Sequence, residues 1–140
     1  MQKDYLFKTT AVNKDGGNGK AYIKDGMVVP IASIHGKERL GTNPEELLAL
    51  SYSTCLNSTL QSILRARKLN NETEVRVDVY FKRNQTDRRF FFQVDAFIEV
   101  KGMTIEEMTP FVEEAHYRCP VSQLMHESET VTVNPWIFED

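Results

Sequence analysis

The middle of this sequence carries the signals of a long α-helix, and that helix restricts what the rest of the chain can form. The segment opens with GTNPEE at residues 41–46. Pro44 suits the first turn of a helix, where a missing N–H costs nothing. A capping box fits in two ways, with either Thr42 or Asn43 as the cap and the glutamate three residues later as its partner. The helix can continue to about Lys68, after which two asparagines end it.

The apolar residues of this segment cover more than one stripe of the helix. They are Leu47, Leu48, Leu50, Leu56, Leu60, Ile63 and Leu64. An apolar surface that wide predicts that the first half of the helix is nearly surrounded by protein.

Strands are expected on both sides of this helix. Extended or alternating runs predict them at residues 6–12, 20–23 and 27–31 before the helix, and at 75–81, 90–100 and 130–136 after it. Two shorter helices are expected at residues 104 to about 118 and 119 to about 125, the first with Thr104 and Glu107 as a capping box. This order predicts a single α+β domain over residues 1–140, with mainly antiparallel strands.

Composition and charge exclude several classes of protein. Hydrophobic residues make up 41% of the chain and charged residues 26%, which is typical of a globular protein. The net charge of -3 gives no reason to expect a nucleic-acid partner, and the cluster of Arg65, Arg67 and Lys68 fits a solvated helix end. No stretch approaches the roughly 20 apolar residues of a membrane span, and residues 1–10 do not resemble a signal peptide. We therefore expect a cytoplasmic protein without a membrane partner.

The two cysteines of the chain, Cys55 and Cys119, lie far apart in the sequence. A permanent disulfide is not expected in a reducing compartment, so the pair is either inert or redox-active. Cys55 lies deep in the long helix, beyond the reach of its N-terminal dipole, and a free cysteine there is commonly a small core residue. The polar residues around it, at 51–54 and 57–59, also fit a helix that lines a pocket.

Cys119 precedes Pro120, which makes it the expected N-cap of the following helix. The unpaired N–H groups and the dipole at such a position lower the pKa of a thiol. They also make the sulfur a good leaving group in disulfide exchange. A cysteine that only fills the corner between two helices explains the sequence equally well.

Other arrangements of reactive residues carry weaker signals. The three histidines, His35, His116 and His126, have no metal-ligand spacing, so a zinc site is not expected. His116 and Cys119 could form a nucleophile pair, but a solvated histidine at a helix end is the favoured interpretation. The glycine-rich stretch at residues 16–19 lacks the spacing of a phosphate-binding loop, and no serine lies in a GxSxG context.

Two separated motifs are the most specific signal in the chain. The first is GTNPEELL at residues 41–48 followed by SYSTC at 51–55, and the second is CPVSQ at 119–123. Both resemble motifs of the OsmC/Ohr family, whose names stand for osmotically inducible protein C and organic hydroperoxide resistance protein. The glycine-rich turn at 15–19 and the order of elements also match, so the resemblance covers nearly the whole chain.

The resemblance implies a cysteine-based peroxidase that acts on organic hydroperoxides, in an intertwined homodimer with active sites at the subunit interface. Cys55 matches the peroxidatic cysteine, Cys119 the resolving cysteine, and Glu45 the glutamate that binds an active-site arginine. In the Ohr branch that arginine lies in the first glycine-rich turn, which contains none here. In the OsmC branch it lies before the central helix, where this chain has Lys37 and Arg39. We expect Arg39 to take its place.

The implied chemistry needs no metal or organic cofactor. A Cys55 thiolate attacks the peroxide and becomes a sulfenic acid, Cys119 condenses with it to a disulfide, and an external dithiol restores both thiols. An apolar pocket would favour alkyl or lipid hydroperoxides. Its candidate lining residues are Tyr52, Leu56, Phe81, Phe91 and Met125. The alternative is a stress-related dimer without enzymatic activity that binds small apolar molecules; the missing turn arginine supports it, whereas the two cysteine motifs and Glu45 oppose it.

Overall fold

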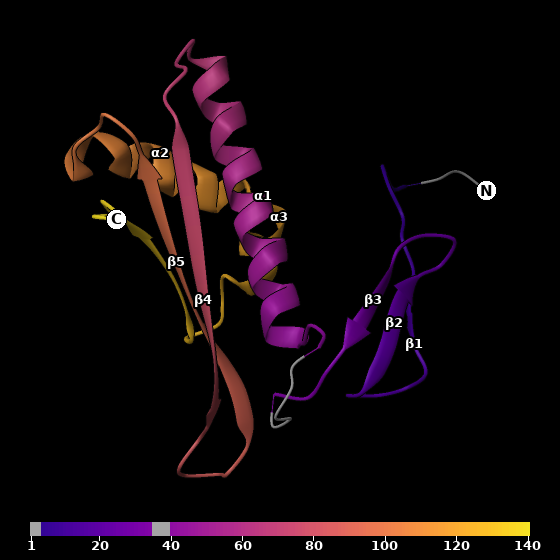
Figure 1. Ribbon diagram of the computed structural model, residues 1–140. Coiled ribbons are helices and arrows are strands. Elements are labelled where there is room, and N and C mark those ends of the chain that lie inside the picture. The colour runs from indigo at the N-terminus through magenta and orange to yellow at the C-terminus, as the bar shows by residue number, and fades with distance from the viewer. Residues whose placement is uncertain (1–3, 35–39) are drawn as a thin grey trace. The chain divides into compact units, whose positions relative to one another are not determined.

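The computed structural model describes residues 4–34 and 40–140 of the chain. The chain forms two compact units, Met1–Pro44 and Glu45–Asp140, and both are drawn in Figure 1. The first unit is a small sheet, and the second combines three helices with a second sheet. The α+β class predicted from the sequence is confirmed, whereas the assignment of residues 1–140 to one domain stays a prediction.

The sheet of the first unit is antiparallel and follows chain order. Its strands are β1 (Ala11–Asn13), β2 (Gly19–Ile23) and β3 (Val28–Ile31). The turn after β1 is closed by the Asn13 side chain, whose Oδ1 accepts the Gly16 N–H at 2.7 Å. Gly16 has φ 77°, a left-handed conformation that glycine adopts without steric cost. The expected strand at residues 6–12 was too long, because only Ala11–Asn13 pairs with β2.

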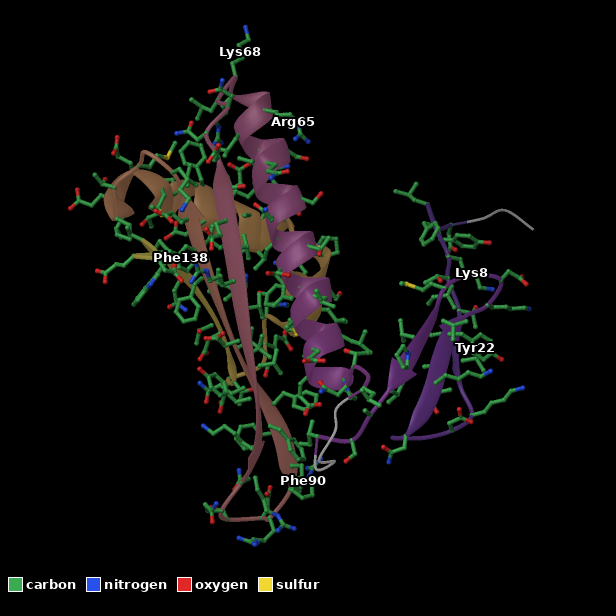
Figure 2. All side chains as sticks on the ribbon, in the orientation of Figure 1. Lys8, Tyr22, Arg65, Lys68, Phe90 and Phe138 are labelled. Atoms are coloured by element: carbon green, nitrogen blue, oxygen red, sulfur yellow. The ribbon has the colours of Figure 1, made fainter. Side chains whose placement is uncertain are left out.

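The predicted central helix is α1 (Pro44–Ala66). It begins at Pro44, so Asn43 rather than Thr42 occupies the N-cap position. The helix ends slightly earlier than expected. Lys68 takes a left-handed φ of 59°, and the Leu69 N–H returns to the Leu64 carbonyl at 2.9 Å, which closes the last turn. Arg65 and Lys68 project from this end of α1, as expected for a solvated helix end (Figure 2).

One face of α1 is buried, and this differs from the wide apolar surface predicted for its first half. The buried residues are Tyr52, Leu56, Leu60, Ile63 and Leu64. Their spacing of three and four residues describes a single stripe. Leu47 and Leu50, by contrast, are 39% and 63% exposed. Within the unit Glu45–Asp140, these two side chains in the first half of the helix are therefore not covered by protein.

The sheet of the second unit contains one antiparallel and one parallel pair. β4 (Thr73–Arg83) pairs antiparallel with β5 (Phe90–Val100), from Thr73 opposite Val100 to Arg83 opposite Phe90. β6 (Val131–Pro135) pairs parallel with β5 because the chain returns through two helices before it re-enters the sheet. The turn end of the β4–β5 hairpin extends beyond the helices (Figure 1).

The two helices of this return connection meet at Cys119. They are α2 (Ile105–Arg118) and α3 (Pro120–Met125). The predicted capping box of α2 is confirmed, because the Thr104 N–H donates to Glu107 Oε1 at 2.9 Å and the Glu107 N–H donates to Thr104 Oγ1 at 3.1 Å. Side chains of α1, β5 and α2 form the buried apolar cluster, which also includes Cys119.

None of the helices in the described part of the chain combines the length and apolar character that a membrane span requires.

Candidate functional site

The two cysteine sulfurs meet between α1 and α3. Cys119 Sγ lies 2.9 Å from Cys55 Sγ, and both residues are free thiols. A hydrogen bond from the Cys119 thiol to the Cys55 sulfur describes this contact. The approach of the two sulfurs that the sequence predicted is therefore confirmed, across 64 residues of sequence.

The position of Cys119 follows from two helix ends. Its own N–H donates to the Ala115 carbonyl at 2.8 Å and completes α2, while its sulfur accepts the Ser122 N–H at 3.5 Å as the N-cap of α3. Pro120 supplies the first helical residue of α3, as predicted. The backbone thus fixes the sulfur from both sides, and the side chain is fully buried.

The expected low pKa of Cys119 is wrong. Burial raises the pKa of this thiol, and the hydrogen bond to Cys55 raises it further, whereas the backbone N–H groups of Ser122 and Val121 act in the opposite direction. Desolvation prevails because the sulfur is shielded from water, and transfer out of water penalises the charged form. Cys119 is consequently a protonated donor at neutral pH, which is the form that its contact with Cys55 requires.

Cys55 is the more accessible of the two cysteines. It lies in the middle of α1 and is partly exposed, whereas Cys119 is buried. The Cys55 sulfur accepts the Cys119 S–H at 2.9 Å. Exposure therefore favours Cys55 as the cysteine that an external electrophile reaches first.

A second polar contact joins the same two helices. Tyr52 Oη and Ser122 Oγ are 2.7 Å apart, and both side chains are fully buried. Burial raises the pKa of Tyr52, so its hydroxyl stays protonated. The sequence predicted Tyr52 as a residue that lines a pocket, whereas a role for Ser122 was not predicted. The signal that could have found Ser122 is its spacing, three residues after Cys119, which is a neighbour distance on a helix.

The other four predicted pocket residues fall into two separate groups. Leu56 is fully buried in the core cluster, and Met125 packs against that cluster. Phe81 is 45% exposed and stacks on Phe90 near the turn end of the β4–β5 hairpin, where Figure 2 labels Phe90. Phe91 lines a separate cleft of about 290 Å³ near that turn. The structure therefore brings Leu56 and Met125 into the cluster that contains Cys119 and leaves Phe81 and Phe91 in the hairpin.

Glu45, the predicted carboxylate of the site, lies outside direct contact with the sulfurs. Glu45 is in the first turn of α1 and lines a cleft with residues of β4. Cys55 follows ten residues later, which corresponds to a rise of about 15 Å along the helix. Glu45 therefore cannot bind the sulfur itself. Arg39 and Lys37 lie outside the described residues.

His116 lies three residues before Cys119, and one nitrogen of its ring is buried. His116 Nδ1 is buried without a hydrogen-bond partner, and burial lowers the pKa of the ring, with a smaller effect from His126. No hydrogen bond joins His116 to either sulfur within residues 4–34 and 40–140. Over the same residues, no group of three or more histidine, cysteine or acidic side chains is arranged to hold a metal ion.

The chain matches the family model described as OsmC-like protein over residues 35–134. It is 31% identical to organic hydroperoxide resistance protein-like 2 of Staphylococcus saprophyticus over 134 residues, which cover 91% of this chain and 94% of that protein. It is 29% identical to the organic hydroperoxide resistance protein OhrA of Bacillus subtilis over 133 residues, which cover 91% of this chain and 94% of that protein.

Solved structures share the fold. A proposed redox protein from Lactobacillus casei superposes with a TM-score of 0.89 and 36% identity, over 97% of this chain and 94% of that one. The organic hydroperoxide resistance protein OhrB of Bacillus subtilis superposes with a TM-score of 0.85 over 94% of this chain and 100% of that one. At 23% identity, the similarity to OhrB concerns the fold alone.

Proposed function

The chain belongs to the OsmC-like protein family, and from that premise we propose that it is a thiol-dependent peroxidase that reduces organic hydroperoxides to alcohols. The observation that supports this proposal most strongly is the 2.9 Å contact between the sulfurs of two free cysteines, one accessible and one buried. The names of the relatives, organic hydroperoxide resistance proteins, point to the same substrate class.

In the proposed reaction, the Cys55 thiolate attacks one oxygen of the peroxide bond. The O–O bond breaks, Cys55 becomes a sulfenic acid, and the other oxygen leaves with a proton as the alcohol. The Cys119 thiol then attacks the oxidised sulfur, so that an S–S bond forms and water leaves. A dithiol from solution reduces this disulfide, is itself oxidised to a cyclic disulfide, and returns both cysteines to thiols.

The attacking role of Cys55 and the resolving role of Cys119 follow from their surroundings. An attacking sulfur must be reached by the substrate, and Cys55 is partly exposed. A resolving sulfur must stay reduced until its partner is oxidised, and a buried, protonated thiol reacts slowly with peroxide. The raised pKa of Cys119 keeps it in that form until the sulfenic acid appears next to it.

We assign Arg39 as the cation that activates Cys55 and Glu45 as the carboxylate that holds its guanidinium, since a bidentate pair fixes such a group well. The assembly is an intertwined homodimer. An apolar pocket at Cys55 would favour alkyl hydroperoxides over hydrogen peroxide.

A turnover assay tests the proposed function. The purified chain is mixed with cumene hydroperoxide and with each of several dithiols, and consumption of the peroxide is followed for the wild type and for Cys55→Ser. Multiple turnovers by the wild type and none by Cys55→Ser would support the proposal. No turnover with any dithiol, together with saturable binding of cumyl alcohol, would instead favour a protein that binds small apolar molecules.

A further inference from the structure

The hydroxyl groups of Tyr52 and Ser122 form a hydrogen bond beside the two sulfurs. Tyr52 lies three residues before Cys55 on α1, and Ser122 lies three residues after Cys119 at the start of α3. Residues three apart on a helix are neighbours on its surface. The contact of 2.7 Å between the two oxygens and the contact of 2.9 Å between the two sulfurs therefore run side by side between the same two helices.

The hydroxyl contact restrains the buried cysteine through a short path. The Ser122 side chain binds Tyr52, and the Ser122 backbone N–H donates to Cys119 Sγ at 3.5 Å. One residue thus connects the phenol of α1 to the sulfur at the N-cap of α3. A hydrogen bond at one point leaves a short helix free to pivot, whereas two contacts fix its rotation against α1.

The hydrogen bond between Tyr52 and Ser122 is fully buried, so within the described part of the chain each hydroxyl has only the other as its partner. Tyr52 and Ser122 both have no exposed surface. A buried hydroxyl that loses its partner has no water to replace it, so α3 must shift or the site must open. Either change moves Cys119 relative to Cys55.

We propose that Tyr52 and Ser122 are positioning residues that hold the Cys119 thiol in attack geometry against oxidised Cys55. This inference rests on the proposed peroxidase function. The step that it serves joins the Cys55 sulfenic acid and the Cys119 thiol into a disulfide with release of water. The sulfurs must close from 2.9 Å to about 2.05 Å, so a small displacement of α3 slows the reaction. While the step is slow, further peroxide converts the sulfenic acid to a sulfinic acid.

The test measures how oxidised Cys55 divides between its two fates. Wild type, Tyr52→Phe and Ser122→Ala are treated with cumene hydroperoxide and quenched at intervals, and mass spectrometry determines disulfide and sulfinic acid. The inference predicts that the ratio of disulfide to sulfinic acid falls about fivefold to tenfold in both variants, the rate equivalent of one lost hydrogen bond. Tyr117→Phe, which changes a tyrosine that is 75% exposed, is the matched control and should keep the wild-type ratio.

The double variant separates positioning from general destabilisation. If the two hydroxyls act as one unit, Tyr52→Phe with Ser122→Ala changes the ratio no more than either single change. A general loss of stability would add up in the double variant and would lower the thermal midpoint in parallel. An unchanged ratio in both single variants, or fully additive losses, would overturn the inference.

Oxidation without peroxide distinguishes a failure of this inference from a failure of the proposed function. Diamide oxidises two thiols directly to a disulfide and needs no peroxidase chemistry. If Cys55 of the wild type resists cumene hydroperoxide, the proposed function fails. Slower diamide-driven disulfide formation in Tyr52→Phe and Ser122→Ala would even then support positioning of Cys119, and equal rates would refute it.

Discussion

The sulfur site between α1 and α3 is buried, whereas the turn end of the β4–β5 hairpin is exposed. At the sulfur site, Tyr52, Cys119 and Ser122 are fully buried, and each polar atom has a partner on a neighbouring element. In the hairpin, Phe81 is 45% exposed and Phe90 is 60% exposed. Their contacts lie on a surface that water also reaches.

The two regions differ in whether water can replace a contact that is lost. Arg83 lies over the Phe90 ring, 4.6 Å from its centroid, and its Nε donates to the Arg88 carbonyl. Water can take over either interaction at an exposed site, so each contributes little. At the buried site, water cannot enter without opening the core, so each group depends on its partner. Reactivity should therefore be sensitive to change at the sulfur site and tolerant of change in the hairpin.

The largest predicted effect is the loss of peroxide reduction in Cys55→Ser, because a hydroxyl cannot supply the soft, readily ionised nucleophile of a thiol. Initial rates with cumene hydroperoxide and a dithiol measure it. The hairpin counterpart is Phe90→Leu, which keeps an apolar side chain and should retain wild-type turnover. Equal activity of Cys55→Ser and wild type would eliminate the mechanism, and loss of activity in Phe90→Leu would end the contrast between the two regions.

The next effect concerns the proposed cation. Arg39→Ala should slow alkylation of Cys55 by iodoacetamide at neutral pH on the order of tenfold, because a cation beside a sulfur favours its reactive, charged form. Glu45→Ala should cause a smaller defect of the same kind, since it only releases the guanidinium. Lys37→Ala is the matched control on the same stretch of chain. A defect in Lys37→Ala with normal alkylation in Arg39→Ala would show that the wrong residue was chosen.

Stability should show the same contrast on a smaller scale. Leu60→Ala removes a fully buried side chain of α1 and should lower the free energy of unfolding by about 2–5 kcal/mol. Phe81→Ala in the hairpin should cost about 1 kcal/mol, because nearly half of that ring already faces solvent. Urea titrations of the two variants measure both values. Equal losses would mean that the hairpin is covered in solution, as a subunit interface would cover it.

Much of the fold was predictable because strong local signals set it. Pro44 and Pro120 mark helix starts, and the capping box of Thr104 and Glu107 lies where the sequence placed it. The parallel pairing of β6 with β5 was not predicted, since strand order depends on how α2 and α3 return the chain. The strand predicted at residues 6–12 was too long for a related reason, because the sequence shows extended runs but not which part of them finds a partner.

The candidate site was predictable in its cysteines and not in its surroundings. The motifs around Cys55 and Cys119 indicated that the sulfurs meet. The pKa of Cys119 was predicted with the wrong sign, because its N-cap position is visible in the sequence while its complete burial is not. Ser122 was missed because its partner Tyr52 lies 70 residues away. Tertiary packing, which a local motif does not contain, decides both features.

The smallest predicted effect is the pH dependence that Cys119 gives to stability. Its pKa is raised in the folded chain, so the unfolded chain loses this proton first as pH rises. The stability that the neutral thiol contributes is complete below about pH 8.5 and is lost as pH rises through the folded pKa. Unfolding free energies from pH 7 to 10 should therefore fall more steeply for wild type than for Cys119→Ala. Parallel curves would contradict the assignment of a buried, neutral thiol.

The most direct test of the central claim is peptide mapping of the chain after one equivalent of cumene hydroperoxide. The account predicts a disulfide between Cys55 and Cys119 in the wild type, a sulfenic acid at Cys55 in Cys119→Ser, and an unmodified Cys119 in Cys55→Ser. Persistence of the Cys55 thiol under excess peroxide, or oxidation of Cys119 before Cys55, would contradict it.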